Sequence, residues 1–326
     1  MTSSIVLQEA TAAALESNEP GKSRILRRSK KSKRLFLYIV PFLVLVFIFS
    51  YLPLYGWIFS LYDYKPALGI GGSEFVGFFW FELLVASPTQ IAQIGQVLLN
   101  TLAISFLGIA TSVLPLIFAL FLNEVRAPWF RNAVQTLTTL PNFISWVLVY
   151  MIAFSLFSSS GLVNHMLIDS GLITAPMKFL DSNDNVWLTM TLWSVWKGLG
   201  WGAIIYLAAI SGIDQALYES ARIDGAGRFQ IMRYITVPQL MPTYLVLLLL
   251  SIANLLNNGM EQYYVFQNAF NKEYIQVLDL YVYNVGITGN SLSLATAIGM
   301  LKSLVSVVLL FTVNGIAKRV RGESIV

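Results

Sequence analysis

The sequence contains no cysteine and only one histidine, His165. The lack of cysteine excludes disulfides, thiolate chemistry and cysteine-ligated metal sites, and a lone histidine is more often structural than catalytic. We therefore predict no metal site. Charged residues are also scarce, at 12% of the 326 positions. A soluble domain of this length usually carries about twice that share of charge.

Several catalytic motifs are missing as well. There is no G-x-x-x-x-G-K-[ST] loop to hold nucleotide phosphates, and the glycine-rich stretch GIGG at 69–72 has no Lys-Ser/Thr after it. H-E-x-x-H and G-x-S-x-G are also absent. We predict that this chain is not an enzyme and binds no cofactor, so any ATP hydrolysis must take place on another chain.

Long apolar runs are abundant, since 56% of the residues are hydrophobic. Runs near 20 residues are long enough to cross a bilayer as helices, and helices satisfy their own backbone polar groups in lipid. The sequence therefore predicts an all-α membrane protein with six transmembrane helices. Their approximate ranges are 35–61, 97–122, 134–157, 186–211, 241–257 and 293–316.

Positive charges predict the orientation, because Lys and Arg concentrate in cytoplasmic segments. Residues 1–34 carry eight of them, and the 123–133 loop, the 212–240 loop and the C-terminal tail carry more. The opposite loops hold only Lys65, Lys178 and Lys272. We expect both termini to be cytoplasmic, with a retained basic tail at 1–34, a six-helix domain at 35–318 and a short tail at 319–326. A stop against translocation explains the basic tail better than nucleic-acid binding does.

One charged segment, ESARIDGAGRFQIMRYITVPQLMP at 219–242, separates two apolar runs. Asp214 is placed to cap a short helix ahead of it, and Gly225 and Gly227 permit a sharp turn. A second short helix follows, which Pro238 and Pro242 are expected to end before the next span. Two short helices meeting at a glycine corner suit docking into a groove of another protein, although a plain solvated loop remains the alternative.

The pattern E-S-A-x-x-D-G-A-G resembles the cytoplasmic EAA motif of permease subunits in bacterial binding-protein-dependent ABC importers. Ser220 departs from the motif by replacing its middle alanine, a small-for-small change. The stretches TLPNFISWV (139–147) and WKGLGWGAIIYLAAISGIDQALYESARIDGAGRF (196–229) resemble the sugar-type, maltose-permease-like importers, in particular the subgroup for complex oligosaccharides and alginate-type polysaccharides. The resemblance covers nearly all of the chain beyond residue 35.

This resemblance implies the type I ABC importer permease fold, located in the bacterial cytoplasmic membrane, with the 212–240 segment as a coupling loop. It implies a second homologous permease, two ABC ATPase subunits that bind ATP and Mg²⁺, and an extracytoplasmic solute-binding protein. The cargo would be an oligosaccharide or polysaccharide fragment. The alternative is a self-sufficient channel or secondary transporter, but no repeat between the two halves supports it. By the resemblance, the residues that contact the ATPase are Glu219, Ser220, Ala221, Asp224, Gly225, Ala226, Gly227 and Phe229.

Residues of the substrate path are predicted from polarity inside the spans. Lys197 and Lys302 are charges in expected spans, and such charges are often functional. Aromatic faces and a few placed polar groups suit sugar rings. The predicted path consists of Asn142, Tyr150, Trp193, Lys197, Trp201, Asn257, Glu261 and Lys302. Two lysines would favour an acidic saccharide, unless they pair with Glu261 or with backbone carbonyls and only hold helices together.

Overall fold

The computed structural model describes residues 36–321. The predicted tail at 1–34 and the end of the predicted tail at 319–326 lie outside these residues. The described part of the chain is mostly helical, and its strands are one antiparallel pair of two residues each, β1 (Tyr62–Asp63) and β2 (Glu74–Phe75). The predicted all-α class is therefore confirmed.

The chain divides into two compact units after Ile58. In the first unit a helix over residues 36–46 continues through a π-helical turn, η1 (Phe47–Tyr51), into the 3₁₀ helix η2 (Leu52–Leu61), whose residues from Phe59 on belong to the second unit. The second unit holds the remaining elements. They are η3 (Ile70–Gly72), α3 (Phe79–Ala86), α4 (Pro88–Thr111), α5 (Leu114–Asn123), α6 (Pro128–Thr139), η4 (Leu140–Phe143), α7 (Trp146–Phe157), α8 (Leu162–Asp169), α9 (Val186–Ser211), α10 (Gln215–Ile223), α11 (Arg228–Ile231), η5 (Met232–Thr236), α12 (Val237–Ala253), α13 (Glu261–Phe266), α14 (Lys272–Ile275), α15 (Leu278–Tyr283), η6 (Asn284–Thr288) and α16 (Leu292–Arg321).

Five helical stretches of the described chain are long and apolar enough to cross a membrane. They are Phe36–Leu61, Pro88–Asn123, Trp146–Asp169, Arg228–Ala253 and Leu292–Arg319. A sixth is obtained when the bent pair of helices α9 and α10, whose axes differ by 71°, is counted as one span. This set matches the six predicted spans in number and order.

Three of the spans differ from the prediction, and the second, predicted at 97–122, begins earlier, at Pro88. The third predicted span, 134–157, is broken at η4, where Pro141 lies in a 3₁₀ turn between α6 and α7. Proline lacks the backbone donor that a continuous helix needs, so the chain changes direction there. The fifth predicted span, 241–257, begins much earlier, because the helix starts at Arg228 and continues to Ala253.

The prolines of the coupling loop do not end a helix, contrary to the prediction. Pro238 is the second residue of α12 but lies within the continuous helical stretch Arg228–Ala253, and Pro242 lies further inside α12. The π-helical turn η5 directly precedes α12. The wider π turn changes the hydrogen-bond register just before the first proline, and the helical path continues through both.

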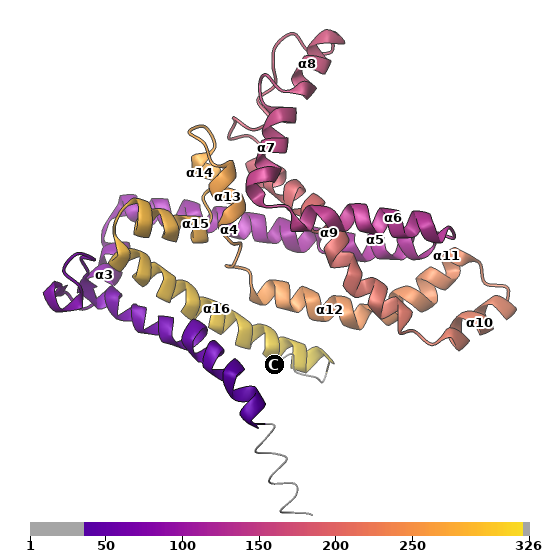
Figure 1. The fold of residues 1–326 in the computed structure, drawn as a ribbon, viewed down its shortest axis with the longest axis horizontal. Coiled ribbons are helices and arrows are strands. Elements are labelled where there is room, and N and C mark those ends of the chain that lie inside the picture. The colour runs from indigo at the N-terminus through magenta and orange to yellow at the C-terminus, as the bar shows by residue number, and fades with distance from the viewer. Residues whose placement is uncertain (1–35, 322–326) are drawn as a thin grey trace, which may run out of the picture. The chain divides into compact units, whose positions relative to one another are not determined.

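Helix α9 is the centre of the second unit and packs against α4, α5 and α6, as Figure 1 shows. Gly200 permits the closest of these approaches, since a methyl group there would collide with the backbone of Thr138 and Thr139. Small residues let membrane helices approach in this way. Helix α12 packs on α16, α4 and α9. These contacts enclose the space in which the candidate site lies.

Side chains of α4 also hold the polar stretch that follows α12. Asn100 Nδ2 donates to the carbonyls of Glu273 and Gln276, at 2.8 and 3.1 Å. The hydroxyl of Thr101 accepts the backbone N–H of Leu278 at 2.9 Å. Asn100 and Thr101 are fully buried. In a membrane protein such buried polar groups fix an irregular segment, because they leave it no unsatisfied backbone.

Candidate functional site

The coupling loop at 212–240 has the predicted local structure. The side chain of Asp214 accepts the N–H of Ala216 at 2.9 Å and so caps α10. Gly225 has φ +80°, a left-handed conformation that favours glycine, whereas Gly227 has φ −72° and begins α11. Only the first of the two glycines is therefore required by backbone geometry.

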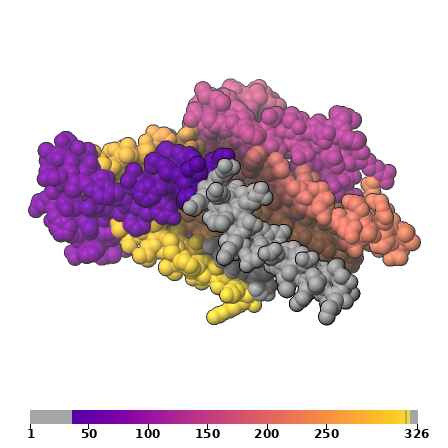
Figure 2. All heavy atoms as spheres, turned by 60° about the horizontal axis from the view of Figure 1, so that its bottom comes forward, coloured from indigo at the N-terminus to yellow at the C-terminus, as the bar shows by residue number. Residues whose placement is uncertain are grey.

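The predicted ATPase-contact residues lie together on this loop, and its atoms form the right-hand edge of the surface in Figure 2. Six are exposed, while Ala221 and Ala226 are half-buried. Phe229, one of these residues, is 71% accessible, and the large apolar side chains of Ile223 and Tyr234 beside them are 86% and 70% accessible. Ile223 was not among the ATPase-contact residues predicted from the sequence, although it directly precedes Asp224, which was.

The loop is attached to the helices behind it by few polar contacts. Arg228 lies 3.9 Å from Glu124 at the end of α5, and the hydroxyls of Tyr218 and Thr236 are 3.2 Å apart. A hollow of about 720 Å³ lies between α10, α11 and the end of α5. The arrangement therefore exposes an apolar centre with charged edges, as a protein-docking surface requires.

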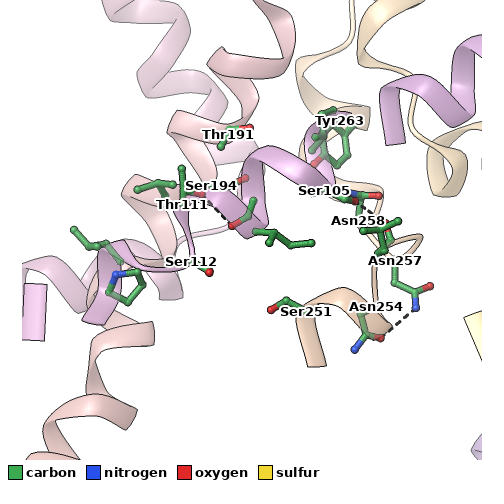
Figure 3. Close-up of a pocket in the computed structure, with 18 residues that line it drawn as sticks. Ser105, Thr111, Ser112, Thr191, Ser194, Ser251, Asn254, Asn257, Asn258 and Tyr263 are labelled. Carbon is green, nitrogen blue, oxygen red and sulfur yellow. Dashed lines mark hydrogen bonds between the residues drawn. The ribbon is translucent and has the colours of Figure 1, made fainter. Parts of the chain in front are cut away.

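A second candidate site is a cavity of about 440 Å³ between α4, α5, α9 and α12, which we call the inter-helix cavity. Figure 3 shows the hydroxyl groups of Thr111, Ser112, Thr191 and Ser194 on one side and the amide groups of Asn254, Asn257 and Asn258, which follow α12, on the other, with Ser105 of α4 beside Asn258. The polar side chains of its wall are Ser105, Thr111, Ser112, Thr191, Ser194, Ser251, Asn254, Asn257, Asn258 and Tyr263.

The described residues that line the inter-helix cavity are all uncharged. Burial raises the pKa of the Tyr263 phenol, and the carboxylate of Asp279 adds to that effect, so this group stays neutral at physiological pH. The Oδ1 atom of Asn258 is buried and accepts no hydrogen bond from described residues. The cavity therefore presents neutral donors and acceptors, which match sugar hydroxyl groups.

Only one predicted path residue, Asn257, lines this cavity. The other wall residues escaped sequence reasoning, although their spacing carried a signal. Ser105, Gly108 and Ser112 recur at three and four residues, as do Thr191, Ser194 and Gly198. That spacing places each set on one face of a helix.

Lys197 binds elsewhere in the protein. Its Nζ donates to the carbonyl oxygens of Pro141 and Asn142, at 3.2 and 2.8 Å, and lies 5.4 Å from the ring centre of Trp146. Asn142 therefore contributes its backbone carbonyl, and not its side-chain amide, to this contact. The arrangement joins α9 to the break between α6 and α7.

Lys302 is paired with Asp279 of α15, and the two side chains are 14% and 21% exposed. The remaining predicted path residues are dispersed. Tyr150 and Trp193 pack against Phe266, with ring centres 5.1 and 6.0 Å away. Trp201 is half exposed, and Glu261 is exposed at the start of α13. The eight residues are thus not gathered around one cavity.

The apolar helices, the polar cavity among them and the exposed loop point to the class of helical membrane transport proteins. Residues 111–322 match the family described as the binding-protein-dependent transport system inner membrane component. The chain belongs to this family, and it is an inner membrane component of such a transport system. That match also rules out the alternative of a self-sufficient channel or secondary transporter.

Among the similar proteins, one permease and one solved transporter carry names that refer to polysaccharides. Protein LplB of Bacillus subtilis is 39% identical over 91% of this chain and 92% of its own length. The polygalacturonan/rhamnogalacturonan transport system permease protein YteP of the same organism is 37% identical over 97% and 98%. The crystal structure of a bacterial ABC transporter involved in the import of the acidic polysaccharide alginate contains a chain with TM-score 0.79 and 32% identity, covering 91% of this chain and 99% of that one. The protein is a permease of the sugar ABC importer group.

Proposed function

We propose that this chain forms half of the translocation path of an ATP-driven importer for oligosaccharides of several sugar units. The inter-helix cavity carries the proposal, because it lies among helices of three candidate membrane spans and is lined by hydroxyl and amide groups. The names of YteP and of the alginate importer support a polysaccharide-derived cargo.

The proposed complex contains a second homologous permease, two ABC ATPase subunits and a solute-binding protein. A related importer has been crystallised with an alginate pentasaccharide-bound periplasmic protein, which supports the last of these partners. This chain would be non-catalytic, with ATP and Mg²⁺ bound by the ATPases. Both termini would be cytoplasmic, so that the coupling loop meets the ATPase.

The cavity itself favours recognition of hydroxyl groups over carboxylates. Lys197 and Lys302, which suggested an acidic cargo, are both engaged by groups of the protein. If the cargo is a uronate oligomer, its charge would be balanced outside this cavity.

Filling the cavity tests the proposal. Gly198 lines it, and a Cβ built there meets no atom within 4 Å. Gly198→Leu should therefore fold, since leucine has a higher helix propensity than glycine by up to about 1 kcal/mol. It should lower uptake at least about tenfold by occluding the path. Uptake is measured with a panel of oligogalacturonides, alginate oligosaccharides and neutral arabino-oligosaccharides.

Gly95→Leu is the matched control. Gly95 lies in α4 outside the cavity, and a Cβ there also meets nothing within 4 Å. This variant should transport normally. Equal, undiminished uptake in the two variants would show that the cavity is not part of the path.

A further inference from the structure

One wall of the inter-helix cavity is an irregular segment at residues 254–260 between α12 and α13, which we call the wall segment. It presents Asn254, Asn257 and Asn258 to the cavity. Leu256 anchors it and is 7% exposed. Gly259 has φ +73°, so the backbone turns through a left-handed conformation there.

The wall segment is tied to α4 on one side. Ser105 Oγ donates to the carbonyl of Leu255 at 2.5 Å, and Asn258 Nδ2 donates to the same hydroxyl at 2.8 Å (Figure 3). Ser105 thus fixes the position of the amide whose Oδ1 atom accepts no hydrogen bond from described residues.

On the other side the wall segment is tied to α15 and α16. The N–H of Gly259 donates to Asp279 Oδ2 at 2.9 Å. The second oxygen of the same carboxylate, Oδ1, pairs with Lys302 Nζ of α16. Because Lys302 holds Oδ1 of Asp279, the other oxygen, Oδ2, is directed toward the wall segment.

The ion pair contributes no atom to the cavity, since neither Lys302 nor Asp279 lines it. A charge left alone in a poorly solvated site is costly, and the two partners therefore constrain each other strongly. Removing the ammonium would favour rotation of the Asp279 carboxylate toward water. The Gly259 N–H would then lose its acceptor.

We propose that Lys302 and Asp279 are positioning residues that hold the wall segment, and with it the amides of Asn257 and Asn258, at the edge of the cavity. The role in transport rests on the proposed function, whereas the role in holding the segment does not. Lys302 acts through Asp279 and Gly259 rather than by contacting substrate.

The absence of cysteine in the chain gives a direct test. Leu256→Cys places a thiol at the buried anchor of the wall segment, and Val149→Cys places one at a fully buried position of α7. Maleimide labelling is followed in the whole importer complex, purified in lipid nanodiscs. Adding Lys302→Met should speed labelling at position 256 about tenfold and leave position 149 unchanged.

Lys302→Asp combined with Asp279→Lys should restore slow labelling, because it restores the pair. Gly259→Ala, which strains the same turn and keeps both charges, should speed labelling as Lys302→Met does. Lys65→Met is the matched control, since Lys65 pairs with Asp63 at 3.4 Å in an exposed ion pair. It should change nothing.

Unchanged labelling at position 256 in both Lys302→Met and Gly259→Ala would overturn the proposal. Faster labelling at positions 256 and 149 together, without recovery in the charge swap, would also overturn it by showing general unfolding.

Transport measurements separate this proposal from the proposed function. With the best transported oligosaccharide of the panel, Lys302→Met should raise the half-saturating concentration more than it lowers the maximal rate. Faster labelling without any change in uptake would confirm the tether and contradict the path.

Discussion

At the scale of single residues, charge inside the membrane is used to join elements. Lys197 donates to the carbonyl oxygens of Pro141 and Asn142 at the helix break η4, and the Pro141 carbonyl also accepts the N–H of Ile144. An ammonium group satisfies such carbonyls well, because each bond to a charged donor contributes about 1.5–3 kcal/mol. The contact therefore stabilises the break between α6 and α7 against α9.

Lys197→Met should lower the thermal midpoint of the complex, since methionine preserves the apolar stem and removes both hydrogen bonds. The destabilisation should be on the order of 2 kcal/mol. Fluorescence-detected size-exclusion after heating measures the midpoint, and Lys178→Met at an exposed position is the control. An unchanged midpoint with a raised half-saturating oligosaccharide concentration would instead indicate that Lys197 contacts the substrate.

At the scale of elements, the coupling loop depends on one backbone turn. Gly225 has φ +80°, while Gly227 has φ −72°, and a Cβ at either position meets no close neighbour. The two glycines therefore differ in backbone conformation rather than in space. This makes them a matched pair for testing the corner between α10 and α11.

Gly225→Ala should weaken coupling, because alanine in the left-handed region costs about 1 kcal/mol and shifts the angle between the two short helices. Substrate-stimulated ATP hydrolysis by the reconstituted complex should fall several-fold. Gly227→Ala should retain normal stimulation. Equal behaviour of the two variants would contradict the assigned role of the corner.

Sequence patterns predicted the elements that depend on local physics. Apolar length identified the spans, and Asp214 and Gly225 identified the cap and the corner of the coupling loop. The continuation of the helix through Pro238 and Pro242 was not predictable, because a π turn and tertiary contacts compensate for the missing backbone N–H donors. Helix packing overrides the usual effect of proline there.

The candidate site was harder to predict, because its contacts join segments that are far apart in the sequence. The partner of Lys302 is Asp279, which belongs to a different helix 23 residues earlier and could not be identified from spacing within a span. Charge was the stronger signal in the sequence, yet the cavity is lined by hydroxyl and amide groups. Their three- and four-residue spacing on α4 and α9 would have indicated a shared face.

At the scale of the whole molecule, the chain is one component of a larger machine. The described residues provide a cavity lined by polar groups and an exposed loop, and the sequence has no nucleotide-binding motif. Large apolar side chains such as Phe106 and Phe311 face outward from the spans, as expected for contact with lipid or another membrane subunit. In the proposed importer the energy comes from separate ATPase subunits, in keeping with the family of transport-system components to which the chain belongs.

The most direct test is to tag this chain in its native host, extract it in mild detergent and identify the co-purifying proteins by quantitative mass spectrometry. The account predicts a second permease and a P-loop ATPase, with two ATPase subunits for each copy of this chain. It further predicts that Glu219→Lys removes the ATPase while the second permease is retained, whereas Lys178→Met retains both. A stable homo-oligomer without an ATPase would contradict the account.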